Sequence, residues 1–169
     1  MISAAKYFQQ GNYDKVIRIL EPQVFEHRDD WKFYSYLGYS SLYTGDFIKA
    51  SSYLQRALQI NPTALELMYG IAVLHLKKGE TADAVRLWLH ILHKKPDDTY
   101  AKEGLEFINS TDNKQLSRLL TLKKCRSFLP CRDNRKKYLI KVGIVGGILF
   151  AALLCTIFLA MTCKAGDLL

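Results

Sequence analysis

Residues 31–64, WKFYSYLGYSSLYTGDFIKASSYLQRALQINPTA, decide how this chain folds. Glycine recurs at intervals of 34 residues through and around this stretch, at Gly11, Gly45 and Gly79. Small or apolar residues follow each glycine at matching offsets. A strict repeat of this length predicts a stack of helical hairpins, because each unit buries its apolar face only against the next unit.

Each repeated position has a structural reason. The recurring glycine allows a tight turn after the first helix of a hairpin. Gly38 on a first helix is expected to face Ala50 on the second, and Ala72 and Ala84 repeat that pair in the next unit. Small residues at these positions let the two helix axes approach closely. Pro62 follows the second helix, where proline cannot continue it.

This pattern resembles the tetratricopeptide repeat (TPR) family. Residues 65–98 also fit it, residues 1–30 fit in their second half, and residues 99–112 are interpreted as a capping helix over the last apolar face. The predicted fold is therefore all-α: a TPR helical-hairpin solenoid of about three repeats plus a capping helix, over residues 1–112. The residues of 31–64 that carry the resemblance are Leu37-Gly38, Gly45-Asp46-Phe47, Ala50, Ala57-Leu58 and Asn61-Pro62.

The resemblance implies a concave groove, lined by the first helix of each repeat, that holds a peptide or an amphipathic helix of a partner protein. Tyrosine is frequent at these positions, and its large ring with a polar hydroxyl suits such a ligand. Packing of the same rings within the repeats, against the N-terminal helix or against the tail is the alternative. The candidate groove residues are Tyr36, Tyr39, Tyr43, Tyr69, Val73, Tyr100 and Phe107.

Residues 142–163, VGIVGGILFAALLCTIFLAMTC, contain no charged side chain. As a helix they would span about 33 Å, close to the ~30 Å hydrocarbon core of a bilayer. We therefore expect one C-terminal transmembrane helix, followed by a short tail, residues 164–169. This arrangement predicts a tail-anchored, single-pass protein, and a bacterial inner membrane, a mitochondrial outer membrane and the endoplasmic reticulum all fit.

The net charge of +8 is concentrated before this apolar run. Residues 113–141 carry ten Lys or Arg and one Asp. This placement favours anionic lipid headgroups over nucleic acid as the partner, and it places the repeats in the cytoplasm. Lys114–Arg126 is expected to form one short basic amphipathic helix, either on the membrane surface or as a solvated linker. The basic residues nearest the span are Arg132, Arg135, Lys136, Lys137 and Lys141.

Small residues recur at four-residue intervals within the apolar run, at Gly143, Gly147 and Ala151. Such a stripe permits two membrane helices to pack closely. A homodimer, or pairing with a membrane partner, is one interpretation. The other is the general frequency of glycine in membrane spans.

Sequence motifs for chemistry are missing. There is no phosphate-binding loop and no Gly-x-Ser-x-Gly motif. His90 and His93 have no further metal ligands nearby in sequence. We therefore expect no enzyme activity, metal or cofactor. The leading hypothesis is a membrane-anchored adaptor or scaffold that binds a partner protein, and the alternative is a co-chaperone or assembly factor for a membrane protein complex.

Overall fold

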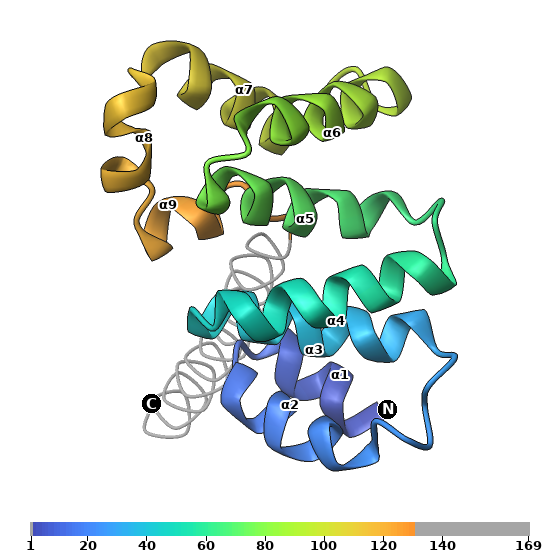
Figure 1. Cartoon of the computed structure of the whole chain (residues 1–169). Helices are drawn as coiled ribbons and strands as arrows, with labels where there is room; N and C mark the ends of the chain where they lie inside the picture. Colours follow the sequence, from blue (N-terminus) through green and yellow to red (C-terminus); the bar gives the residue numbers. More distant parts are fainter. Residues whose placement is uncertain (1, 131–169) are drawn as a thin grey trace, which may run out of the picture. The chain divides into compact units, whose positions relative to one another are not determined.

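A computed structural model describes residues 2–130 of the chain. Over this range the protein is helical and has no strand (Figure 1), which confirms the all-α prediction there. The elements are α1 (Ile2–Gln9), α2 (Tyr13–Leu20), the 3-10 helix η1 (Glu21–Gln23), α3 (Trp31–Thr44), α4 (Phe47–Ile60), α5 (Leu65–Lys78), α6 (Thr81–Lys94), α7 (Thr99–Ser110), α8 (Asn113–Leu119) and α9 (Leu122–Ser127).

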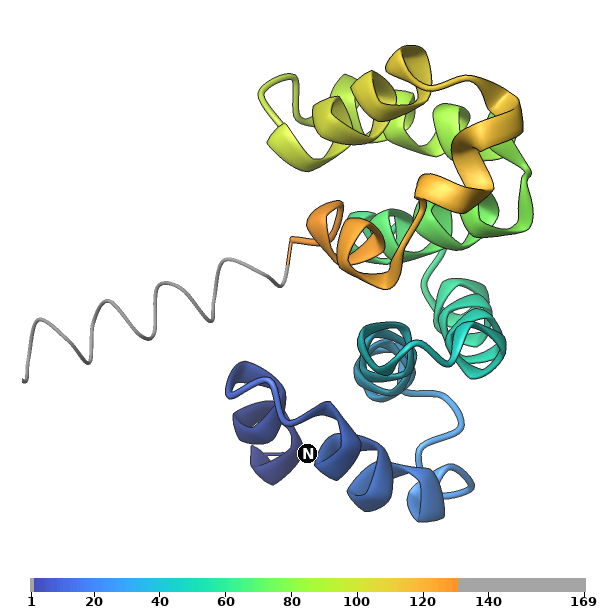
Figure 2. The ribbon, with the colours of Figure 1, turned by 90° about the vertical axis from the view of Figure 1, so that its left-hand side faces the viewer.

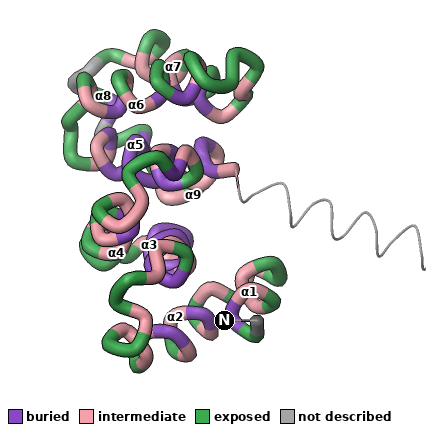
Figure 3. The backbone as a smooth tube through the Cα atoms, turned by 90° about the vertical axis from the view of Figure 1, so that its right-hand side faces the viewer, coloured by how far each residue is buried: buried purple, intermediate pink, exposed green. Residues whose placement is uncertain are grey.

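Successive helices pair into hairpins that stack in chain order. The pairs are α1 with α2, α3 with α4, and α5 with α6, and α7 packs on α6 (Figures 1 and 2). Burial is concentrated on the first helices α3 and α5, which lie between neighbouring repeats (Figure 3). This layout is consistent with the expected TPR solenoid.

The turn inside each hairpin depends on the recurring glycine. Gly45 and Gly79 have φ values of 94° and 84°, in the left-handed region that side chains other than glycine rarely adopt. Asp46 then caps α4, because its carboxylate accepts the Lys49 amide N–H at 3.0 Å. The same short motif therefore ends one helix and begins the next.

Close helix crossings also repeat along the chain. A Cβ atom added to Gly70 would lie 2.6 Å from Cδ1 of Leu54, and one added to Gly104 would lie 2.5 Å from Cε2 of Trp88. Both pairs are the same contact displaced by 34 residues. The expected close crossing at Gly38 is also present, but the atoms nearest its missing side chain belong to Leu54 rather than to Ala50.

The segment expected to form one helix over Lys114–Arg126 forms two, α8 and α9. The chain breaks at Thr121, whose hydroxyl accepts the Lys124 amide N–H at 3.3 Å and so caps a new helix. The expected domain boundary after residue 112 falls between α7 and α8, yet packing continues beyond it. The side chains buried within the domain, from this segment and from the residues directly after it, are Leu116, Leu120, Cys125, Phe128 and Leu129.

This burial corrects the expectation for the apolar face of the segment. We expected that face to rest on lipid or to belong to a solvated linker, but Leu116 and Leu120 are buried within the domain, while Leu119 stays half exposed. The physical reason is that the end of the stack offers an apolar surface close to the segment, and burying apolar side chains there removes them from water. The basic side chains of α9 do not prevent this, since Lys123, Lys124 and Arg126 occupy other positions than the buried Cys125.

The expected transmembrane helix over residues 142–163, the tail 164–169 and the small-residue stripe lie outside the described residues, as do the five basic residues nearest the span. Within residues 2–130, no helix combines the length and the apolar character needed to cross a bilayer. The anchor therefore stays a prediction from sequence.

Candidate protein-binding site

The seven candidate groove residues lie on the first helices, as the resemblance implied, but they do not form an open surface in this structure. Tyr36, Tyr39 and Tyr43 belong to α3, Tyr69 and Val73 to α5, and Tyr100 and Phe107 to α7. Tyr39, Tyr43, Tyr69 and Val73 are buried, whereas Tyr36, Tyr100 and Phe107 are half-buried. Three different sets of contacts account for this.

The N-terminal hairpin covers the tyrosines of α3 that are nearest to it. The ring of Phe8 meets the ring of Tyr36 edge-on, with 5.2 Å between centroids. The ring of Tyr13 stacks on that of Tyr43 at 4.3 Å, with an angle of 7° between the planes. Tyr36 and Tyr43 therefore help to attach α1 and α2 to the stack.

Tyr39 and Tyr69 join neighbouring repeats. The Tyr39 hydroxyl donates to the Glu66 carbonyl and accepts the Gly70 amide N–H at 3.3 Å. The Tyr69 hydroxyl donates to the Asp98 carboxylate at 2.6 Å. Burial, and then the bond to this carboxylate, raise the pKa of Tyr69 well above its usual value. Both side chains thus fix the geometry between repeats.

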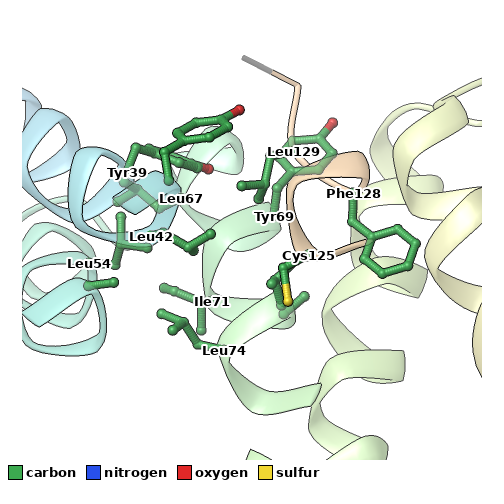
Figure 4. Packing of buried hydrophobic residues seen from close by; sticks show 14 of the residues in the cluster. Tyr39, Leu42, Leu54, Leu67, Tyr69, Ile71, Leu74, Cys125, Phe128 and Leu129 are labelled. Atoms are coloured by element: carbon green, nitrogen blue, oxygen red, sulfur yellow. The ribbon is translucent and has the colours of Figure 1, made fainter. Parts of the chain in front are cut away.

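The remaining part of the surface is covered by residues 120–130, which we call the docking segment. It consists of α9 with its flanking residues and lies beside α5 (Figures 1 and 2). Phe128 is fully buried, with ring centroids 5.6 Å from Trp88 and 5.5 Å from Phe107. Leu129 is buried in the same cluster (Figure 4). The docking segment therefore inserts its apolar residues between α5, α6 and α7.

Polar contacts hold both ends of the docking segment through its backbone. The ammonium group of Lys77, in the last turn of α5, donates to the Leu120 carbonyl at 3.1 Å. The Tyr100 hydroxyl, on α7, donates to the Pro130 carbonyl at 3.4 Å. Because carbonyl groups accept both bonds, these contacts do not depend on the side chains at either end.

Cationic side chains of α9 add contacts of a different kind. The guanidinium of Arg126 donates to the Tyr43 carbonyl in the last turn of α3, where carbonyl groups lack helical partners and favour a cation. The ammonium of Lys124 lies 4.9 Å from the ring centroids of both Phe107 and Phe128. Part of the basic charge that indicated lipid binding thus contacts the repeats.

A family model described as tetratricopeptide repeat matches residues 42–105. The match supports the TPR family. It runs from the end of α3 into α7 and contains the whole α5–α6 hairpin. A comparison with curated proteins found no match. TPR repeats bind protein partners on extended concave surfaces, so the match indicates a protein-interaction role.

Sequence reasoning missed two parts of this surface, the contact of Trp88 with Phe128 and the docking segment. Trp88 occupies the place of a repeat-core residue, and its ring also lies against Phe128, a contact that the repeat pattern does not predict. The docking segment does carry a signal, since Cys125, Phe128 and Leu129 have the three- and four-residue spacing of a helix face. The strong basic charge around them favoured a membrane interpretation instead.

Cys125 is the cysteine of the docking segment, and its side chain is fully buried. Burial raises the pKa of the Cys125 thiol, and the nearby positive charge of Lys77 offsets this only in part. A protonated, inaccessible thiol reacts slowly with alkylating reagents. The reactivity of Cys125 therefore reports whether the docking segment is in place.

Among residues 2–130, one group of potential metal ligands occurs at the turn between α5 and α6. The ligand atoms of His75, Glu80 and Asp83 lie within 4.8 Å of one another. His75 Nδ1 is 2.5 Å from a Glu80 carboxylate oxygen, and Asp83 pairs with Arg86 at 3.1 Å. These exposed contacts account for the three side chains, so we assign no metal to them.

Proposed function

We propose that this protein is a membrane-anchored TPR adaptor or scaffold that binds a partner protein on the surface formed by α3, α5 and α7. One observation carries the proposal: the docking segment, which contains the short helix α9, lies on this surface with the side chains of Leu120, Cys125, Phe128 and Leu129 fully buried. A surface that accepts one helix in this way has the shape and chemistry for helix recognition. No catalytic step forms part of the proposal.

Anchoring rests on the sequence. The uncharged run of residues 142–163 has the length of a bilayer span, and the basic residues before it favour a cytoplasmic position for the repeats. The same basic residues would contact anionic headgroups. Pairing of two anchors through the small-residue stripe at Gly143, Gly147 and Ala151 is a separate part of the proposal.

Site-specific photocrosslinking in native membranes tests the proposed binding surface. A photoreactive residue replaces Tyr100, which borders the docking segment, in the full-length chain. The matched control carries the same residue at Ile48, whose side chain is 86% exposed on α4. We expect one abundant partner from position 100 that is missing from position 48. Identical products at both positions would argue against the surface, and many weak products specific to position 100 would favour an assembly factor.

A fractionation experiment tests the anchor separately. We expect the full-length chain to stay with membranes during alkaline extraction, and a chain without residues 142–163 to appear in the soluble fraction. Replacement of Gly147 by Ile should weaken self-association in membranes if the stripe joins two anchors. Extraction of the full-length chain at alkaline pH would contradict the anchor and leave the binding surface unaffected.

A further inference from the structure

We infer that the docking segment is an intramolecular ligand of the TPR surface, and that the partner presents a helix of the same pattern, which must displace it. The inference rests on the proposed function and names the kind of partner: an amphipathic helix with a small apolar residue, an aromatic residue and leucine at the relative positions of Cys125, Phe128 and Leu129.

The length of α9 is the first argument. This helix has six residues, far fewer than an isolated helix needs to be stable in water. Its helical form therefore depends on the surface on which it lies. A segment that folds only on contact with a surface behaves as a ligand of that surface, and a better ligand can replace it.

The division of contacts is the second argument. Backbone carbonyl groups of Leu120 and Pro130 accept the bonds from Lys77 and Tyr100, so the repeats would hold another chain there equally well. Side-chain selection falls on Phe128, between the rings of Trp88 and Phe107. Lys124 and Arg126 add cationic contacts with the Phe107 ring and the Tyr43 carbonyl. The surface thus combines general recognition of a backbone with one aromatic pocket.

Covalent attachment of the docking segment sets the affinity that a competing partner helix needs. Residues 111–119 connect α7 to the docking segment, and so short a connection gives the segment an effective concentration on the order of millimolar. A free helix of equal intrinsic affinity would therefore compete only weakly. The intramolecular contact selects for partners that bind more tightly or arrive at high local concentration.

Displacement can be measured with a peptide of residues 118–130 in which Cys125 is changed to Ala. The target is the full-length chain in detergent micelles with Cys131→Ser, Cys155→Ser and Cys163→Ser, so that alkylation reports Cys125 alone. We expect peptide at concentrations well above the millimolar effective concentration of the segment to raise the alkylation rate by about tenfold or more, because displacement exposes the thiol. The matched control peptide also carries Phe128→Ala and should leave the rate unchanged.

A second measurement covers the case in which the free peptide cannot displace the covalently attached docking segment. Fluorescence anisotropy compares binding of the labelled peptide to the wild-type chain, to Phe128→Ala and to Leu119→Ala, whose side chain is half exposed. We expect Phe128→Ala to bind the peptide about tenfold more tightly than the other two chains, because the competing segment is weakened. Circular dichroism confirms that the repeats of this variant are folded.

The outcomes separate this inference from the proposed function. If neither the alkylation rate nor the affinity changes as expected, the docking segment is a fixed part of the fold and the inference is wrong. If the peptide displaces the segment but crosslinking finds no partner, the inference about the segment stands and the adaptor proposal fails. A crosslink between two copies of the chain would identify the docking segment of a second molecule as the occupant instead.

Discussion

The four helices α3 to α6 and the two helices α8 and α9 are stabilised in different ways. Each of the former has 14 residues, is preceded or followed by a repeated turn motif, and packs on neighbours related by the same interval. The latter have seven and six residues and depend on the surface beneath them. Local sequence therefore specifies the repeats, whereas the end of the chain takes its structure from tertiary contacts.

Trp88 belongs to both regions, so its removal should have the largest effect. Trp88→Ala takes away the side chain that fills the space beside Gly104 and also one wall around Phe128. We expect the free energy of unfolding in urea to fall by about 3–5 kcal/mol. The control is Leu89→Ala, whose side chain is 53% exposed and whose effect should stay within about 0.5 kcal/mol. Equal effects of the two changes would contradict the described core.

Phe128→Ala should separate the two regions. The docking segment loses its single aromatic ring, which is fully buried, while the glycine turns and close crossings of the repeats are unchanged. We expect tryptic cleavage after Lys123, Lys124 or Arg126 to become about tenfold faster or more, and the fragment with α1 to α7 to stay resistant. Simultaneous digestion of the repeats would show that the two regions unfold together.

Gly45 and Gly79 form a matched pair that measures the contact between the regions. Both have positive φ, so replacement by Ala should lower the free energy of unfolding by about 1–2 kcal/mol at each position. A new Cβ at Gly45 would also lie 3.3 Å from a methyl group of Leu122, whereas none of the described atoms lies within 4 Å at Gly79. Only Gly45→Ala should also increase cleavage in the docking segment.

The smallest expected effect concerns a surface contact that joins η1 to α4. The Lys49 ammonium, at 2.6 Å, lowers the pKa of the Glu21 carboxyl below its usual value, and the Tyr53 hydroxyl at 2.9 Å adds to this. A lowered folded-state pKa gives stability that is complete above the unfolded pKa and is lost as the pH falls through the folded pKa. Urea unfolding from pH 6 to pH 3 should therefore be slightly less pH-dependent in Glu21→Gln, and an unchanged profile would contradict the contact.

The sequence predicted the repeats well because the decisive interactions are local. A glycine that must turn and an aspartate that caps the next helix, as at Gly45 and Asp46, act within a few residues of each other. The interval of 34 residues then multiplies this local information. The match of residues 42–105 to a TPR model agrees with the resemblance read from these positions.

The candidate site was predictable only in part. Sequence placed the seven groove residues on the correct helices. The hydrogen bonds of Tyr39 and Tyr69, however, reach residues about one repeat away, and composition could not predict these partners. The docking segment was harder still, because the same Lys and Arg residues that suit a membrane surface also suit helix ends and aromatic rings. Whether such a cation contacts a membrane surface, a helix end or an aromatic ring depends on the surface that lies nearby in the folded protein.

The position of the docking segment also sets the length of free chain between the repeats and the expected transmembrane span. Pro130 is followed by eleven residues, 131–141, before the expected span begins, and a chain of that length reaches at most about 40 Å. Release of the docking segment would add eleven residues, 120–130, and about 40 Å of further reach. If the anchor is as proposed, docking limits the distance between the repeats and the bilayer. A partner that displaces the docking segment would then also increase that maximum distance.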